Sequence, residues 1–222
     1  MPRARALAAV ALPLAALAAC SNRPNDLYTY YDDPTTGTST SSTPTTTAAP
    51  VTTTTSAKPQ PEQVVALGVL RASDLVAEEV TGDPSAPRVT ALPDCGIDLG
   101  TGPSRQGAWT YPSGAKLRQV VLYAEDATEF VETVRAGLDC TTFKVGGTTF
   151  QVDKAVPLPA LPGTDAKFAW CATGTAKSSC TVALAAGPLA TVVTVEASTA
   201  TRAKAAITRV SPTAAAALSR GA

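Results

Sequence analysis

The five cysteines carry the most reactive side chains of this sequence, and they fall into two groups. Cys20 stands alone near the start, whereas Cys95, Cys140, Cys171 and Cys180 are spread over the rest of the chain. No two of the four have the C-x-x-C spacing of redox motifs or zinc sites, and an even set in an exported chain favours disulfides. We expect two disulfides, with a four-cysteine zinc site as the alternative, and a separate role for Cys20.

Cys20 ends a segment that has the features of an export signal. Two arginines near the start precede an apolar run from Ala6 to Ala19, which is typical of a secretory signal peptide. The run is shorter than the roughly 20 residues that a membrane-spanning helix needs, and Pro13 interrupts it. A cysteine directly after Leu-Ala-Ala matches a lipobox, in which the thiol receives a diacylglycerol before the preceding peptide bond is cut.

This motif predicts how the protein is held and where it works. We expect residues 1–19 to be a cleaved lipoprotein signal peptide and Cys20 to become a lipidated N-terminus; an ordinary cleaved signal is the alternative. Two or more acyl chains, such as palmitate, anchor a protein stably in a bilayer. The expected location is therefore extracytoplasmic, on the outer face of the cell membrane, with the membrane as a partner through the lipid on Cys20.

Few residues of the sequence could carry catalysis. It has no histidine, so it lacks the usual base of serine and cysteine nucleophiles and the commonest metal ligand. It also has no nucleophile-elbow, P-loop or dinucleotide-binding motif. Two carboxyl groups across a groove can still share acid and base roles, and Asp94, Asp98 or Glu196 are the candidates. We predict a non-enzyme without metal or cofactor, with a carboxylate-dependent hydrolase as the remote alternative.

Charge and composition divide the mature chain into a tether and one domain. The 18 basic and 18 acidic residues of the full sequence cancel, and loss of Arg3 and Arg5 with the signal peptide leaves 16 against 18, so no binding to nucleic acid is expected. From Ser21 to Pro61, Thr, Ser and Pro dominate, and such a segment has too few apolar side chains to drive folding. We expect residues 20–62 to form a disordered tether with a reach of about 35 Å, and residues 63–222 to fold as one domain.

The clearest helix is predicted at residues 125–138. Asp126 and Glu129 form a helix-capping pattern at its start. The apolar residues on one face at helical spacing are Ala127, Phe130, Val131, Val134 and Leu138. Glu125, Glu129 and Glu132 lie on the other side, and we interpret them as a solvated helix surface, because no nitrogen or thiolate partner accompanies them for a metal site.

Strand patterns dominate the rest of the domain. Residues 116–123 alternate, and the second half of this segment reads as a strand buried on both faces. Gly146-Gly147 predicts a hairpin between residues 141–145 and 148–152. A short helix from Ser73 to about Thr81, a strand at 88–92 and a closing helix after Ser198 or Thr199 are also expected. Pro212 should break that last helix near Val210.

A second hairpin predicts how the cysteines pair. A four-residue turn at Gly174–Lys177 between strands at 167–172 and 178–185 places Cys171 directly opposite Cys180. Opposed residues in an antiparallel pair have Cα atoms about 4.5 Å apart at the non-hydrogen-bonded positions, which is within disulfide range. We predict Cys171–Cys180, which leaves Cys95–Cys140. The succession of helices and strands indicates an α+β fold with a mainly antiparallel sheet.

Taken together, these motifs resemble a known family. They are the lipobox and Thr/Pro-rich stalk, Ala72-Ser73-Asp74-Leu75, Tyr111-Pro112-Ser113-Gly114, the stretch LRQVVLYAEDATEFV ending in Cys140, and the FAWC…C hairpin. The chain is thereby similar to actinobacterial lipoproteins of the PknH-like extracellular domain family, named after the sensor domain of PknH-type Ser/Thr kinases. The resemblance implies a twisted antiparallel sheet with flanking helices, two disulfides and a ligand-binding or sensing role in the cell envelope.

Candidate ligand-binding residues come from aromatic and basic side chains in the predicted strands. The aromatic ones are Trp109, Tyr111, Tyr123, Phe143 and Trp170, for which core packing is the competing interpretation. Lys116, Arg118 and Arg105 flank the same sheet region and could receive an anionic headgroup or glycan, or could simply be solvated. We predict a tethered binding or sensing domain for an envelope lipid, glycan or protein; the alternative is a structural or scaffolding envelope protein.

Overall fold

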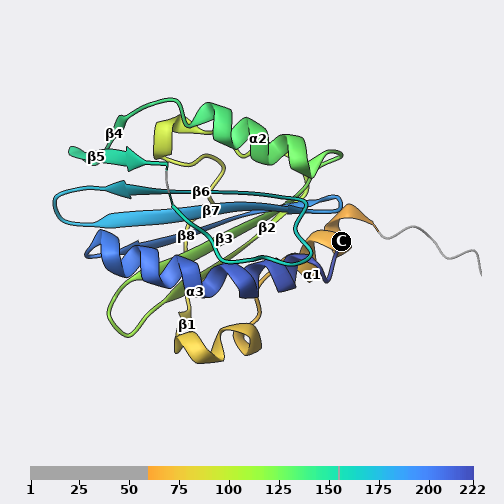
Figure 1. Cartoon of the computed structure of the whole chain (residues 1–222). Coiled ribbons are helices and arrows are strands. Elements are labelled where there is room, and N and C mark those ends of the chain that lie inside the picture. Colours follow the sequence, from red (N-terminus) through yellow and green to blue (C-terminus); the bar gives the residue numbers. More distant parts are fainter. Residues whose placement is uncertain (1–59, 155) are drawn as a thin grey trace, which may run out of the picture. The chain divides into compact units, whose positions relative to one another are not determined.

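The computed structural model describes residues 60–154 and 156–222, so the predicted signal peptide, Cys20 and almost all of the predicted tether lie outside the described residues. The described chain forms one eight-stranded antiparallel sheet with helices on both faces (Figure 1). The predicted α+β class with a mainly antiparallel sheet is therefore confirmed. Within the described ranges, no helix combines the length and apolar character needed to cross a membrane.

The sheet consists of two meanders that meet in its centre. Its strands are β1 (Thr81–Gly82), β2 (Ser104–Thr110), β3 (Lys116–Tyr123), β4 (Thr142–Val145), β5 (Thr148–Asp153), β6 (Ala166–Thr173), β7 (Ser178–Ala186) and β8 (Leu189–Ala197). Their order is β1-β2-β3-β8-β7-β6-β5-β4. Strands β3 and β8 join the two meanders, and Val120, Val121 and Leu122 are buried, as the alternation of the sequence predicted.

Five helical segments accompany the sheet. They are α1 (Pro61–Gly68), the 3₁₀ helix η1 (Ala72–Glu78), the 3₁₀ turn η2 (Asp94–Gly96), α2 (Ala127–Gly137) and α3 (Ala200–Leu218). Helix α1 begins at Pro61, two residues before the predicted start of the domain, and proline is well suited to the first position of a helix. The predicted cap of α2 is confirmed, since the Asp126 carboxylate accepts a hydrogen bond from the Glu129 amide at 2.8 Å.

Helices α1 and α3 cover one face of the sheet, which we call the helix face. Ile207, Val210 and Leu218 of α3 are buried in one cluster with side chains from β3, β7 and β8, such as Leu117 and Val193. On the opposite face, α2 packs on β6, β7 and β8. Figure 1 shows this arrangement of α2 on one side of the strands and α1 and α3 on the other.

One buried polar side chain lies within the helix face. Gln119, which is 1% exposed, accepts a hydrogen bond from the Leu70 amide at 2.8 Å. Its amide nitrogen donates to the Gly68 carbonyl and to the Thr191 hydroxyl, both at 3.2 Å. Gln119 therefore satisfies the backbone groups where α1 ends, which would otherwise be buried without partners.

The predicted break at Pro212 is wrong, because α3 is continuous from Ala200 to Leu218. Pro212 is exposed, so its ring lies on the side of α3 away from the sheet. It has no backbone N–H to donate to the Thr208 carbonyl. Residues on both sides of it, among them Val210 and Ala214, are buried against the sheet. Packing along the whole apolar side of α3 thus outweighs the local cost of the proline.

Two short elements near the start of the domain also differ from the prediction. No strand forms at 88–92, where the only pairing is an isolated bridge between Ala91 and Asp98. The predicted helix at 73–81 is instead a 3₁₀ helix that ends before Glu79, whose backbone has a left-handed φ of 53°. Both segments lack the long apolar periodicity that makes α2 and α3 predictable.

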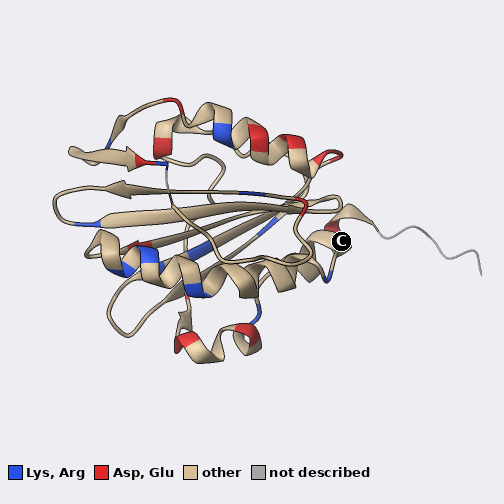
Figure 2. Cartoon of the chain, viewed as in Figure 1, with Lys and Arg blue, Asp and Glu red and all other residues tan. Residues whose placement is uncertain are grey.

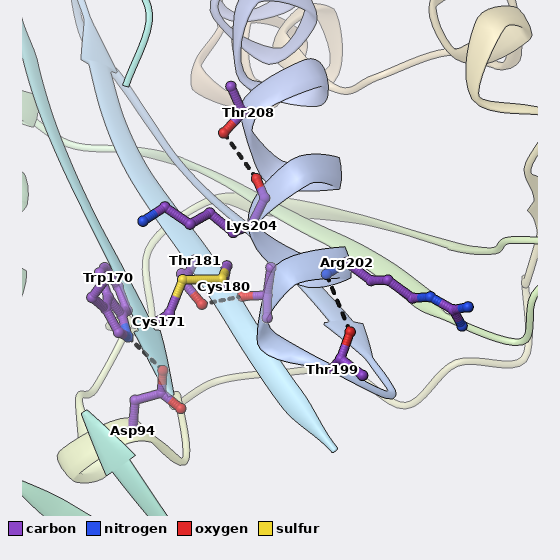
Figure 3. The surroundings of a disulfide bond; sticks show 10 residues. Asp94, Trp170, Cys171, Cys180, Thr181, Thr199, Arg202, Lys204 and Thr208 are labelled. Carbon is purple, nitrogen blue, oxygen red and sulfur yellow. Dashed lines mark hydrogen bonds between the residues drawn. A yellow bond between two sulfur atoms is a disulfide. The ribbon is translucent and has the colours of Figure 1, made fainter. Parts of the chain in front are cut away.

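The two predicted disulfides are confirmed. Cys171 of β6 lies directly opposite Cys180 of β7, with 4.0 Å between the Cα atoms. Figure 3 shows this hairpin disulfide on the side of β6 and β7 that faces α3. Cys95 and Cys140 form the second bridge, with Cα atoms 5.7 Å apart. We call it the wall disulfide, because the two segments that it joins form the walls of a groove on the sheet face that carries α2.

Candidate ligand-binding groove

The sheet face that carries α2 changes character along the strands. On its apolar half, Val120 of β3, Val192 of β8 and Ala183 of β7 lie side by side in register. On its polar half the aligned residues are Lys116, Arg118, Thr194, Glu196, Thr181 and Ser179. Because α2 packs only on the apolar half, the polar half remains open to one side, and we call this the groove face.

Two segments stand over the groove face as walls. The first, residues 89–94, is held by Gln106, whose side chain accepts from the Val89 amide at 2.8 Å and donates to the Val89 carbonyl at 2.6 Å. The second is the β4–β5 hairpin, in which the rings of Phe143 and Phe150 stack with centroids 5.2 Å apart. We call them the wall segment and the wall hairpin.

The wall disulfide connects these two walls. Cys95 directly follows the wall segment, and Cys140 lies two residues before β4 of the wall hairpin. Cys95 has a left-handed φ of 55°, which turns the chain sharply at the end of the wall segment. The bridge therefore fixes the spacing of two segments that are far apart in the sequence.

The sheet forms the floor and the two walls form the sides of a groove of about 200 Å³ that is open to solvent. The apolar and aromatic lining residues are Val89, Leu92, Pro93, Val120, Val192, Phe143, Val145 and Phe150. The polar and charged ones are Asp94, Lys116, Arg118, Lys177, Ser179, Thr181, Thr194 and Glu196. An apolar concavity with a few convergent polar groups is the usual form of a small-molecule site.

The charges of the groove leave an excess of positive charge. Glu196 is neutralised by Lys177, whose ammonium lies 2.8 Å from the carboxylate. Lys116 donates to the neutral Thr110 hydroxyl at 2.8 Å. Arg118 forms no side-chain hydrogen bond or ion pair with any of the described residues. Its charge and that of Lys116 add to the hydrogen bonds from Ser85 in lowering the pKa of Asp83. In Figure 2, basic residues lie on the strands and on α3, and several acidic residues lie on α2.

Asp94 is the remaining acidic residue of the groove, and it is 4% exposed. Burial raises the pKa of its carboxyl group, while the hydrogen bond that it accepts from the Trp170 indole at 2.5 Å lowers the pKa in part. Figure 3 shows the Trp170 ring and Asp94 turned toward each other, on the side of β6 away from the hairpin disulfide. The Asp94 carboxylate is thus bonded to the buried indole at the edge of the groove.

The sequence-predicted ligand residues divide between the two faces. Lys116, Arg118 and Phe143 line the groove, whereas Arg105 does not. Trp170 is fully buried below it and contacts the groove through Asp94. Trp109 is buried in the cluster on the helix face, and Tyr111 and Tyr123 are partly buried against that cluster, so these three residues lie outside the groove.

Sequence reasoning missed Phe150, Thr181, Thr194 and the wall segment as groove residues. For the threonines a signal was available, because Gly187-Pro188 between two apolar strand-like segments indicates a hairpin that aligns Thr181 with Thr194. Their hydroxyl oxygens lie 3.0 Å apart. The wall segment carries no such signal, because it is irregular and is held by the Gln106 side chain.

Only two of the three carboxylates considered for catalysis line the groove. Asp94 and Glu196 line the groove but are bonded to Trp170 and Lys177, respectively. Asp98 lies outside the groove lining and accepts from the Gly100 amide at 2.8 Å. Among the described residues, no three His, Cys, Asp or Glu side chains are grouped as metal ligands would be.

A wider hollow of about 430 Å³ lies on the helix face, between the β2–β3 turn and the first turns of α3. Its Arg209 forms a two-pronged ion pair with Glu78, with both bonds at 3.0 Å. Its Arg202 donates to the Ser198 hydroxyl at 3.3 Å. Arg209 is thus paired with a carboxylate whereas Arg118 of the groove is not, so we take the groove as the candidate ligand site.

We compared the chain with known proteins by sequence and by structure. No family model matches the sequence, and no curated protein matches it. Among solved structures, the fold is similar to the extracellular domain of PknH from Mycobacterium tuberculosis, with a TM-score of 0.48 and 16% sequence identity. The likeness covers 73% of this chain and 96% of that one.

Proposed function

We propose that this chain is a membrane-anchored exported lipoprotein whose domain binds a ligand of the cell envelope in the groove and catalyses no reaction. The observation that carries this proposal is the combination in one open concavity of an apolar, aromatic wall and an unpaired cation, Arg118. Ligand sites in proteins join these two kinds of surface, because apolar burial supplies affinity and a few polar groups fix orientation.

The cysteines support the exported state. All four cysteines of the described chain are paired in disulfides, so Cys20 has no cysteine left in this chain to pair with. Disulfides form and persist in oxidising compartments outside the cytoplasm. A single remaining cysteine directly after Leu-Ala-Ala is what lipidation at Cys20 requires.

The surface of the described domain favours a small ligand over a broad scaffold contact. Leu67 and Val76 are the only large apolar side chains with high exposure among the described residues. They are single residues on α1 and η1, and isolated exposed apolar side chains do not make an interface. The apolar surface that is open to a partner lies instead in the groove.

Native mass spectrometry tests the binding function. The full chain with Cys20→Ala, secreted without lipid and therefore free of detergent, is purified and its bound molecules are identified. Thr194→Phe places a ring in the groove, and Thr149→Phe is the matched control, because Thr149 is exposed on β5 and does not line the groove. We expect a co-purifying envelope molecule that Thr194→Phe displaces and Thr149→Phe retains; equal binding by both variants would contradict the proposal.

The anchor is tested separately, with metabolic labelling by a palmitate analogue. The unaltered chain should incorporate the label and pellet with membranes, and Cys20→Ala should do neither. Cys95→Ala with Cys140→Ala is the control for loss of cysteine, because these residues form a disulfide. Labelling that persists in Cys20→Ala would show that the lipid is attached elsewhere.

A further inference from the structure

The unpaired guanidinium of Arg118 is the starting point for identifying the ligand class, an inference that rests on the groove being the binding site. Arg118 is half-buried on β3, and no described residue bonds to its side chain. Removing a cation from water without a partner is costly. An arginine held in a concavity without an ion pair is therefore suited to an acidic group from outside the chain, which it can bind through two parallel bonds.

The neighbours of Arg118 are hydrogen-bond donors. Lys116 lies two residues away on the same face, about 7 Å along the strand, and carries a second positive charge. Thr194 is paired with Arg118 in register and shares a 3.0 Å hydroxyl contact with Thr181. Only one hydroxyl hydrogen is needed in that contact, so one remains to donate to a ligand. Two cations and a hydroxyl donor favour an oxyanion such as phosphate or carboxylate.

The opposite end of the groove is apolar. Val120, the next residue after Arg118 on the same face of β3, is 5% exposed, and its partner Val192 is 2% exposed. The stacked pair Phe143 and Phe150 forms the facing wall. A ligand that satisfies both ends must carry an acidic group and, directly attached to it, an apolar chain or ring.

We propose that the groove recognises anionic amphiphiles, with the acidic group between Arg118 and Lys116 and the apolar part between Val120 and the Phe143–Phe150 pair. At about 200 Å³, the groove is smaller than the ~300–1,000 Å³ typical of ligand pockets. It therefore takes the acidic group and the first part of the chain, and the remainder extends through the open side. An acidic lipid and a smaller acidic metabolite share this chemistry, and free phosphate lacks the apolar part.

Calorimetric titration of the secreted Cys20→Ala chain tests separately whether the ligand needs an acidic group and whether it needs an apolar chain. The probes share an octyl chain and differ in charge: octyl phosphate, octyl glucoside and octyltrimethylammonium, with inorganic phosphate as the probe without a chain. We expect octyl phosphate to bind at least ~10-fold more tightly than any of the other three, since charge-assisted hydrogen bonds and apolar burial each contribute at that scale. In a series of shorter alkyl phosphates, each added buried methylene should raise the affinity about fourfold until the groove is filled.

Paired arginine variants assign the acidic group to its partner. Arg118→Gln keeps most of the side chain and removes the charge, and it should weaken octyl phosphate binding ~10-fold or more. Arg105→Gln is the matched control, because Arg105 lies on the neighbouring strand β2 but outside the groove. It should leave the affinity unchanged within about twofold, the scale of screened surface charges.

The outcomes distinguish an error in the proposed ligand class from an error in the proposal that the groove binds a ligand. If octyl glucoside or octyltrimethylammonium binds as tightly as octyl phosphate, and Thr194→Phe abolishes that binding, the groove is a ligand site but the anionic class is wrong. If inorganic phosphate binds as tightly, the apolar requirement is wrong. Equal affinities of the Arg118→Gln and Arg105→Gln variants would refute the role of Arg118. If Thr194→Phe and Thr149→Phe leave every titration unchanged, the groove is not the site, and both proposals fail together.

Discussion

Two glutamines in the same sheet perform the same task on opposite faces, and substituting each by methionine should have different consequences. Gln119 bonds the Leu70 amide and the Gly68 carbonyl on the helix face. Gln106 bonds both backbone groups of Val89 and so holds the wall segment over the groove. Methionine matches glutamine in length and offers no comparable hydrogen bond, so each substitution removes the bonds with little change in packing.

The expected magnitudes differ because the surroundings differ. Leu70 is 3% exposed and Gly68 is buried, so Gln119→Met leaves a donor and an acceptor without water. Each such group costs about 1–3 kcal/mol, so for the two groups we expect a loss of about 2–6 kcal/mol in the free energy of unfolding. Val89 and Gln106 are half-buried, so water replaces the lost bonds of Gln106→Met. That loss should be about 1 kcal/mol.

Urea unfolding of the secreted Cys20→Ala chain, followed by circular dichroism, measures both losses. The slope of free energy against urea should stay constant, so that shifts of the midpoint report stability. Octyl phosphate titration completes the comparison: Gln106→Met should weaken binding because the wall segment is loosened, and Gln119→Met should leave binding unchanged at low urea. Equal losses of stability, or a loss below about 1 kcal/mol for Gln119→Met, would refute the role given to burial.

Three further predictions concern the groove and α3. Burial raises the pKa of Asp94, so the folded chain binds this proton more tightly than the unfolded chain, and stability should fall as the pH rises from about 4 through the raised pKa. Asp94→Asn, which keeps an acceptor for the buried indole, should flatten this fall in urea titrations across that pH range. The cysteines of the wall disulfide are half-buried and those of the hairpin disulfide are buried. Mild dithiothreitol should therefore reduce the wall disulfide first, as shown by peptide mapping of alkylated cysteines, and should weaken octyl phosphate binding. Pro212→Ala restores a hydrogen bond within α3 and should raise the free energy of unfolding by about 1–3 kcal/mol, measured as a higher urea midpoint.

Features that depend on local pattern were predictable from the sequence. The pairing of Cys171 with Cys180 follows from the length of one turn, since the register of a hairpin is fixed once its turn is fixed. Helix α2 follows from its Asp126 cap and its apolar spacing. The charged first half and apolar second half of β3 are visible in the alternation of residues 116–123.

Features that depend on distant contacts were not predictable. The wall segment is irregular, and its position depends on Gln106, more than ten residues later in the chain. In the sequence, Gln119 looks like any polar residue of a strand. It is buried and hydrogen-bonded only because the end of α1, which is distant in the sequence, packs against it. Pro212 has a strong local preference to end a helix, which the packing of α3 on the sheet overrides.

The lengths of the helices explain why the groove exists at all. Strand β7 has 9 residues and spans about 30 Å. Helix α3 has 19 residues and spans about 28 Å, so it can cover a strand from end to end. Helix α2 has 11 residues and spans only about 16 Å, roughly half of that length. Figure 1 shows α2 over one end of the strands and the wall hairpin at the other. A short helix on one face therefore leaves half of that face uncovered, and the polar residues of β3, β7 and β8 lie in that half. These strands are apolar where α2 covers them and carry charged and hydroxyl side chains at the uncovered end. That distribution suits a sheet whose uncovered end is in contact with water and with the acidic ligand that we propose.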